Sequence, residues 1–255
     1  MRWRKRGLIY APDGARPWAQ SHAMLPTPML VAGDRIRLYI GCCNQDRVSR
    51  IGFIEVDAQD PMAVLRIGED PVLEIGEPGC FDDNGVVPSS IVRRGDELWL
   101  YYVGFQLGVH VRYLLFSGLA ISHDGGESFQ RYSRVPVMDR CEGETLVRTA
   151  PFVLPEAEGF RMWYLGGDSF ELIGDKLLPR YSLRHLWSPD GIVWGPAGKV
   201  LIEPGCDEHG FGRPQVVRDP EGYRMWYSSR RRGLGYRPGY ADSNRWPTTI
   251  SAMTP

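Results

Sequence analysis

Acidic, basic and histidine side chains recur at matching places along this chain, each shortly before an apolar stretch that contains a proline. Carboxylates can donate or accept a proton during a reaction, and guanidinium groups bind carboxylate or phosphate through paired hydrogen bonds. If the stretches belong to one repeated fold, these side chains gather at one end of the molecule although they are distant in sequence. The side chains selected in this way are His22, Asp82, Asp83, Glu142, Glu144, Arg148, Glu208, His209 and Arg213.

The apolar stretches themselves form a sequence repeat with two kinds of anchor. The anchor prolines are Pro26, Pro88, Pro151 and Pro214, and the aromatic anchors are Tyr39, Tyr102, Tyr164 and Tyr227. Both series advance by roughly 62–63 residues, and a fixed period of this length is typical of repeat architectures. Each unit joins a short apolar strand to an aromatic strand across a Gly/Asp or Glu-Gly turn, which predicts a β-hairpin.

The period also predicts the fold class. No long stretch has an apolar period of 3.6 residues, so we expect almost no helix. Four-stranded units at a fixed period, with aromatic residues on the second strand, are typical of β-propeller blades. The sequence therefore predicts an all-β protein with a single β-propeller domain over residues 1–255. The expected segments are a seam strand in 1–17 and blades at 18–79, 80–141, 142–205 and 206–255, the last one incomplete.

The number of blades is unusual for this prediction. Arg6–Tyr10 has the pattern of the outer strand of a further blade, whose inner strands normally come from the C-terminus. After Asp242 the sequence contains no further unit of acidic loop and aromatic strand. Either the ring closes with four blades, or a fifth blade is missing from this chain. An open seam leaves strand edges unpaired, so we expect marginal stability or self-association at that seam.

Two short motifs predict turns between outer strands. The segment 122–129 fits the pattern Ser-x-Asp-x-Gly-x-Ser/Thr-aromatic, the Asp box found in several propellers, and 188–194 is a degenerate copy. An Asp side chain at such a turn accepts hydrogen bonds from nearby backbone amides. We therefore interpret Asp124 and Asp190 as turn-forming residues and not as catalytic residues.

Composition and motifs argue against several classes of function. The net charge of −1 gives no support to binding of nucleic acid by bulk electrostatics. The five cysteines are odd in number and show no CxxC spacing, which fits reduced thiols in a cytoplasmic protein. No apolar run approaches the length of a membrane span, and no secretory signal begins the chain. No metal-ligand spacing and no glycine-rich phosphate loop occur, so no cofactor or metal is predicted.

Four motifs resemble a known group of proteins. They are His22-x-x-x-Pro-x-Pro, Phe81-Asp-Asp-Asn-Gly-Val-Val-Pro-Ser-Ser, Gly118-Leu-Ala-Ile-Ser-x-Asp-Gly-Gly, and Arg213-Pro-x-Val followed by Met225-Trp-Tyr-Ser. They look like the five-bladed propellers related to glycoside hydrolase families 43, 32 and 130. The resemblance is closest to the uncharacterised glycosidase-like proteins of bacterial polysaccharide and O-antigen gene clusters. It covers the chain up to about Asp242, after which members of that group usually have a complete fifth blade.

The resemblance implies a carbohydrate partner and an enzyme acting on glycosidic bonds of a bacterial polysaccharide or oligosaccharide. Such cleavage uses a carboxylic acid and, in inverting enzymes, a second carboxylate roughly 6.5–9.5 Å away. Asp83 and Glu144, on adjacent blades, are the leading catalytic candidates, and Glu208 is a third. The alternatives are that Asp82 or Asp83 only holds a turn before Asn-Gly, and that Glu142 or Glu144 is simply solvated.

Two further functions stay open because the first blade departs from the family pattern. Family 43 hydrolases resemble one another in an Asp at the start of the first blade, where this chain has Ser21-His22-Ala23-Met24. A phosphorolytic enzyme of the family 130 type needs one acid and cationic residues for phosphate, for which His22, Arg148 and Arg213 are suitable. A non-catalytic carbohydrate-binding propeller needs no acid pair at all.

The remaining candidates concern substrate binding. Trp18, Phe81 and Phe211 are candidates for stacking on a sugar, with ordinary packing as the alternative, and His209 is a further binding candidate. Arg148 and Arg213 are also candidates for structural salt bridges to Asp83 and Glu208. Such bridges hold a carboxylate in its ionised form and oppose a role as general acid.

Overall fold

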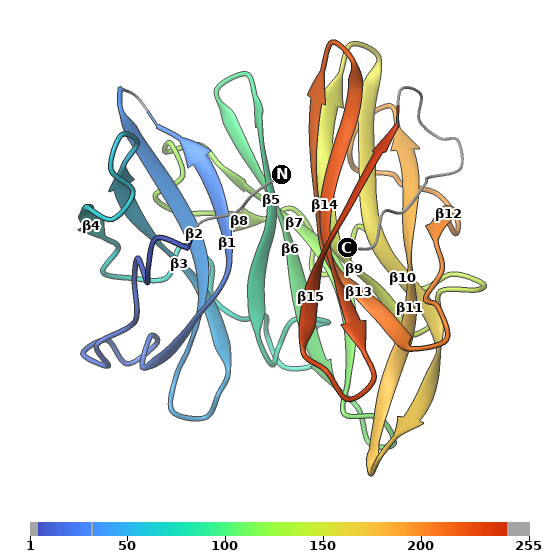
Figure 1. Ribbon diagram of the computed structural model, residues 1–255. Helices are drawn as coiled ribbons and strands as arrows, with labels where there is room; N and C mark the ends of the chain where they lie inside the picture. Colours follow the sequence, from blue (N-terminus) through green and yellow to red (C-terminus); the bar gives the residue numbers. More distant parts are fainter. Residues whose placement is uncertain (1–4, 32, 244–255) are drawn as a thin grey trace.

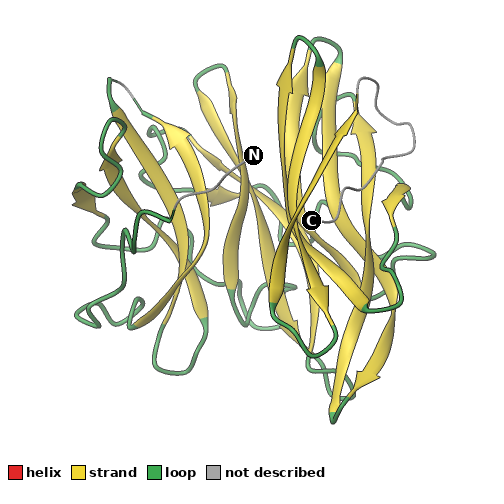
Figure 2. Cartoon of the chain, in the orientation of Figure 1, coloured by secondary structure: helices red, strands yellow, loops and turns green. Residues whose placement is uncertain are grey.

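The computed structural model describes residues 5–31 and 33–243 of the chain. The described part consists of strands and loops and contains no helix (Figure 2), as the sequence predicts. Two predicted segments lie partly outside the described residues. Residues 1–4 of the predicted seam segment 1–17 and residues 244–255 of the incomplete blade 206–255 are not described.

The strands form four antiparallel arrays, here called blades, which follow one another along the chain (Figure 1). The first contains β1 (Ser21–Leu30), β2 (Arg35–Cys43), β3 (Ser49–Asp57) and β4 (Val64–Ile67). The second contains β5 (Val86–Arg94), β6 (Glu97–Leu107), β7 (Tyr113–Ser122) and β8 (Gln130–Arg131). The third contains β9 (Val147–Glu156), β10 (Gly159–Ile173), β11 (Lys176–Ser188) and β12 (Lys199–Ile202). The fourth has three described strands, β13 (Glu208–Asp219), β14 (Gly222–Arg231) and β15 (Tyr236–Ser243).

The first strand of each blade is its inner strand. β1 packs beside β5, β5 beside β9, and β9 beside β13, so the inner strands stand in chain order around a common axis. A short parallel pairing of β7 with β9 joins the second blade to the third. All four inner strands run toward the upper end of Figure 1, so the loops that precede them lie at the lower end.

Aromatic residues on the second strand of each blade build the cores between blades. Side chains alternate between the two faces of a strand, and both faces of these blades are covered, so consecutive aromatic residues are both buried. Tyr101 packs in the core toward the third blade, and Tyr102 packs in the core toward the first. In the third blade, Trp163 faces the fourth blade and Tyr164 faces the second.

The structure shifts the first aromatic anchor by one position. Tyr39 packs toward the following blade, and its hydroxyl donates to the carbonyl of Gly126 in the Asp-box turn of that blade. Tyr101 makes the same bond to Gly191 in the next Asp-box turn. Tyr39 is therefore the structural counterpart of Tyr101, although the sequence aligns it with Tyr102. A shift of one residue places a side chain on the opposite face of a sheet.

The two Asp-box predictions are confirmed. The carboxylate of Asp124 accepts hydrogen bonds from the backbone of Glu127 and Ser128 and from the Ser128 hydroxyl. Burial tends to raise the pKa of Asp124, but the hydrogen bonds from Ser128 and Ser122 outweigh it and lower the pKa to about 2. Asp190 accepts from two backbone amides in the same way. Both carboxylates are thus occupied in closing turns.

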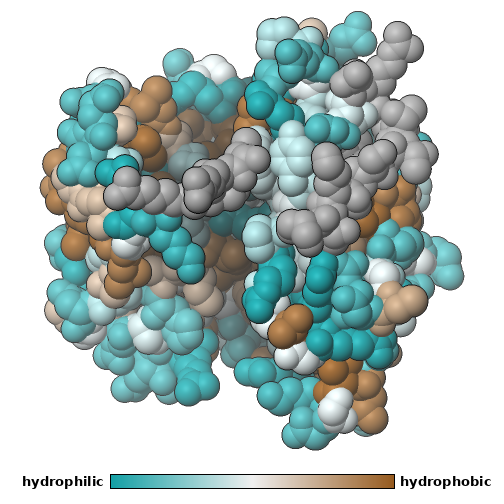
Figure 3. All heavy atoms as spheres, viewed as in Figure 1, coloured by the Kyte–Doolittle hydropathy of each residue, from teal (hydrophilic) through white to brown (hydrophobic). Residues whose placement is uncertain are grey.

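The predicted N-terminal strand is wrong within the described residues. Residues 6–10 adopt no regular secondary structure, and Leu8 is 75% exposed. A strand needs a hydrogen-bonding neighbour, and no described segment forms a ladder with these residues. The first and fourth blades leave an open side between them, visible as the vertical furrow in Figure 3, which we call the seam.

We expect Gly126→Ala to destabilise the protein more than Gly125→Ala. Both glycines have left-handed backbones, with φ of 89° and 75°, so each alanine costs about 1 kcal/mol of strain. At Gly126 the added methyl also collides with the Tyr39 hydroxyl, whereas nothing lies within 4 Å at Gly125. Overpacking adds about 1–3 kcal/mol. Urea unfolding at 25 °C measures the difference, and equal losses in the two variants would contradict the interblade role of Tyr39.

Self-association at the seam stays a prediction. Leu30 on β1 and Val217 on β13, at the inner strands of the two blades that border the seam, are 65% and 48% exposed. Exposed apolar side chains and unpaired strand edges favour association. We expect sedimentation velocity to show a dimer or larger species that grows with protein concentration. A monomer over the whole accessible range of concentration would count against this prediction.

Candidate functional site

Glu144, a leading catalytic candidate, lies in a closed network of ion pairs. Its side chain is fully buried, and one carboxylate oxygen lies 2.6 Å from Nε of Arg148. The other oxygen lies 2.9 Å from Nη1 of Arg184 and accepts a 2.5 Å hydrogen bond from the Tyr164 hydroxyl. The backbone N–H of Gly198 also donates to it. These contacts occupy both carboxylate oxygens and shield them from a substrate, so they support a structural role.

The second blade repeats this arrangement with Asp82. Asp82 is fully buried and accepts hydrogen bonds from the Tyr102 hydroxyl at 2.9 Å and from Nε of Arg131 at 2.8 Å. Burial, and then the charge of Asp82, raises the pKa of Tyr102, so the phenol stays a donor. An acid, a tyrosine 20 residues later and an arginine from an outer strand therefore recur in two blades. Asp83, the preferred member of the pair, is half-buried and accepts from the backbone N–H of Gly79 at 2.8 Å.

Glu208 differs from Asp82 and Glu144, which are paired with arginines. Its carboxylate accepts hydrogen bonds from the Ser229 hydroxyl and from the backbone N–H of Gly205. The nearest cation that contacts it is Arg231, with Nε 4.0 Å away, and the side chain is 14% exposed. Glu208 is thus a partly accessible carboxylate whose close partners are neutral.

The expected salt bridges have other partners than predicted. Arg148 pairs with Glu144 and not with Asp83, and its remaining donors bond to the backbone carbonyls of Asp139, Gly195 and Pro196. Arg213 pairs with no carboxylate of the described residues. Arg148 bonds to a loop near residue 195, and Arg213 bonds to the first blade. Such partners are distant in sequence, so the spacing of residues along the chain does not predict them.

Among the described residues, the two predicted histidines form no ion pair with the predicted acids. His22 is exposed, adopts a left-handed backbone and shares a 2.9 Å hydrogen bond with the hydroxyl of Ser21. His209 is 4% exposed, its Nδ1 has no partner, and burial lowers its pKa. It lines a hollow of about 400 Å³ with Arg230, Arg231 and Tyr236. His209 therefore lies beside a hollow, whereas His22 is exposed.

The predicted stacking aromatics take part in packing instead. Phe81 and Phe211 are 6% and 1% exposed and belong to the cores between blades, so no sugar ring reaches their faces. Trp18 packs against the core of the first blade and donates its Nε1–H to the backbone carbonyl of Glu69. For these three residues the structure agrees with the alternative of ordinary packing.

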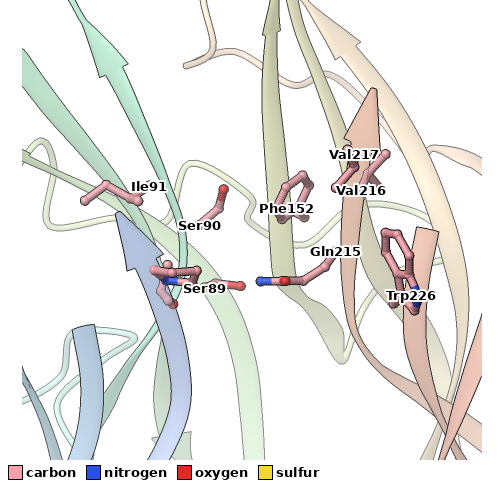
Figure 4. Close-up of a pocket in the computed structure, with 10 residues that line it drawn as sticks. Ser89, Ser90, Ile91, Phe152, Gln215, Val216, Val217 and Trp226 are labelled. Atoms are coloured by element: carbon pink, nitrogen blue, oxygen red, sulfur yellow. The ribbon is translucent and has the colours of Figure 1, made fainter. Parts of the chain in front are cut away.

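A hollow of about 550 Å³, which we call the central pocket, opens among the inner strands (Figure 4). Its polar and aromatic side chains include Ser89, Ser90, Gln215, Phe152 and Trp226, and none of its described lining residues carries a carboxylate. In Figure 4 the side chains of Ser89 and Gln215 point toward one another. The lining consists of Thr27, Pro28, Ser89, Ser90, Ile91, Phe152, Gln215, Val216, Val217 and Trp226.

Arg213 lies beside this pocket. Its Nη2 donates to Thr27 Oγ1 at 2.5 Å and to the carbonyl of Ser89 at 3.3 Å, and both of these residues line the pocket. Its Nε is buried without a partner, and burial lowers its pKa to about 10. The pocket residues were not predicted. The signal that could have found them is the repeated proline, because the pocket-lining residues of each inner strand follow it directly.

Comparison with solved structures shows the class of fold. A putative glycosidase from Bacteroides thetaiotaomicron has a TM-score of 0.72 at 14% identity, covering 98% of this chain and 81% of that one. The GH32 β-fructofuranosidase BmSUC1 of Bombyx mori has a TM-score of 0.62 at 16% identity, covering 89% and 47%. A glycosyl hydrolase from Bacteroides ovatus has a TM-score of 0.69 at 16% identity, covering 96% and 76%. The chain therefore has the propeller fold of glycoside hydrolase-like proteins.

Sequence comparison then places the chain in a family. It is 39% identical over 238 residues to the uncharacterized protein Rv1502 of Mycobacterium tuberculosis. The aligned region covers 93% of this chain and 78% of that protein. The chain belongs to the family of Rv1502. No protein-family model matches it. The predicted likeness to glycoside hydrolase propellers is confirmed for the fold, while families 43 and 130 and the gene-cluster setting stay predictions.

Two kinds of feature are absent from the described residues. They contain no helix long and apolar enough to cross a membrane, and no group of three or more potential ligands placed to bind a metal ion. The expected cytoplasmic location stays a prediction.

We expect Glu144→Gln to cost about 3–5 kcal/mol of folding free energy, because it leaves two arginines beside a neutral group in a buried network. Glu142→Gln is the matched control, since Glu142 is exposed two residues away, and it should change stability by less than about 0.5 kcal/mol. Chemical unfolding of both variants tests the assignment. A Glu144→Gln protein as stable as the control would remove the structural role and restore Glu144 as a catalytic candidate.

Proposed function

We propose that this protein is a carbohydrate-binding propeller that holds a sugar of a bacterial polysaccharide or oligosaccharide in its central pocket. The observation that carries the proposal is the lining of this pocket, in which aromatic faces stand beside neutral hydroxyl and amide groups without a carboxylate. Trp226 and Phe152 offer apolar surface to the ring, and the amide of Gln215 offers hydrogen bonds to its hydroxyls. The hydroxyls of Ser89 and Ser90 donate instead to backbone carbonyls of the third blade. Pockets for small ligands combine these two kinds of surface.

The fold supports the same class of ligand by analogy. Solved structures with this propeller include glycoside hydrolases, although a shared fold does not transfer an activity. Binding without cleavage is favoured because cleavage needs a carboxylic acid and a second carboxylate beside the sugar. Two of the acids that precede inner strands, Asp82 and Glu144, are fully buried and paired with arginines.

The second candidate is a glycoside hydrolase-like enzyme, and Glu208 is the observation that favours it. A carboxylate with neutral close partners and partial exposure is able to exchange a proton with a bound substrate. Asp83 is then the candidate for the second carboxylate, because it makes no ion pair with a described residue. In the phosphorolytic alternative, a bound phosphate takes the place of the attacking water.

Calorimetric titration with manno-, gluco- and galacto-oligosaccharides tests the binding proposal. Trp226→Ala should weaken binding about tenfold or more, as expected for loss of an aromatic stacking surface. Trp187→Ala is the matched control, because Trp187 is 48% exposed on β11 and outside the central pocket. Equal affinities of the two variants, or no binding of any glycan to the wild type, would refute the proposal.

The same glycans and activated glycosides, with and without phosphate, test the enzyme candidate. Turnover that is lost in Glu208→Gln but kept in Asp207→Asn selects the enzyme, since Asp207 is the exposed neighbour of Glu208. A requirement for phosphate selects phosphorolysis.

A further inference from the structure

Arg213 is a partly buried cation for which the described residues provide no anion. The buried arginines have one: Arg37 lies 2.6 Å from Glu55, and Arg148 lies 2.6 Å from Glu144. Arg213 instead donates from Nη2 to one hydroxyl and one carbonyl, and its buried Nε has no partner. A guanidinium removed from water without a counter-charge is costly, so its presence calls for an explanation.

The fold does not require a cation at this place. Arg213 directly precedes an anchor proline and has a left-handed backbone, with φ of 23°. Leu25 and Ala150 precede the corresponding prolines in the first and third blades and are also left-handed, with φ of 53° and 52°. The same bulge therefore forms with small or apolar side chains. A tie between blades would need only a neutral donor, which would avoid the desolvation of a charge.

The position of Arg213 connects it to the central pocket. Its two acceptors, Thr27 and Ser89, both line that pocket, and they come from the first and second blades, whereas Arg213 comes from the fourth. The guanidinium thus lies where three blades meet, beside the proposed sugar site. Its Nη1 makes no hydrogen bond to the described residues and is not buried, so it can serve a ligand, whereas its Nε is buried.

We infer that the sugar bound in the central pocket carries a carboxylate, as in a uronic acid, and that Arg213 binds this group. The inference rests on the proposed carbohydrate-binding function and names its class of ligand. A single guanidinium matches the one charge of a carboxylate, and the planar donors suit its two oxygens. A phosphate monoester carries up to two charges, and the described lining of the pocket offers no second cation to balance them.

The test compares a trisaccharide of galacturonic or glucuronic acid with the same trisaccharide after reduction of its carboxylates to alcohols. Titration calorimetry on the wild-type protein should show about 10- to 100-fold tighter binding of the acidic form, as for one charged hydrogen-bonded pair. This comparison changes only the ligand, so it does not depend on how a variant folds.

Variants then assign the effect to Arg213. Arg213→Gln, checked for folding by urea unfolding, should bind both trisaccharides equally, and Arg213→Lys should keep part of the preference. Arg218→Gln is the matched control, because it removes an exposed charge from the same strand outside the pocket. It should leave the preference unchanged. A preference that survives in Arg213→Gln would overturn the assignment.

The remaining outcomes are distinct. Equal binding of the acidic and the reduced trisaccharide to the wild type would overturn this inference and leave carbohydrate binding in place. Tighter binding of a sugar phosphate than of the uronide would overturn the choice of carboxylate. No binding of any glycan would overturn both the inference and the proposed function.

Discussion

Each blade of this protein has two apolar faces, and the rest of the structure depends on covering both. Consecutive aromatic residues such as Tyr101 and Tyr102 point to opposite faces of one strand, and both are fully buried. A blade with such a strand cannot face water on either side, so the blades stack around an axis. At the seam no second blade of the described residues stands against the first or the fourth blade, and on the first blade Tyr10, Trp18 and Ala19 pack over the face instead. The central pocket opens among the inner strands close to the seam.

Packing the blades this tightly also buries polar groups, and the buried acids Asp82 and Glu144 have hydrogen-bonding partners. Asp82 and Glu144 each accept from a tyrosine and from arginines, so their charges are balanced inside the fold. Such networks are costly to break, and their carboxylates already have partners inside the fold. Of the three acids that the sequence suggests as catalytic, Glu144 therefore serves the blades, while Asp83 and Glu208 keep neutral close partners.

Arg213 is the exception to this balance. Its neighbours are a hydroxyl and a carbonyl, and it lies beside the pocket where three blades meet. Unpaired buried charge is rare in proteins because desolvation is costly, and it is found where a ligand or a reaction supplies the missing partner. Asp82 and Glu144 have cationic partners inside the fold and therefore belong to the structural framework. Arg213 has no anionic partner among the described residues and therefore marks the candidate binding site.

The sequence by itself determined the repeat, the hairpins, the all-β class and the Asp-box turns, because these depend on residues close together along the chain. It also selected Glu208 and Arg213 as residues of interest. Only the tertiary structure decided that Glu144 is paired with Arg184, 40 residues away, and that Arg213 reaches Thr27, 186 residues away. It also decided which face Tyr39 takes and that residues 6–10 form no strand. These outcomes depend on which blade packs against which, and a charge or an edge strand has no fixed partner until the blades are assembled.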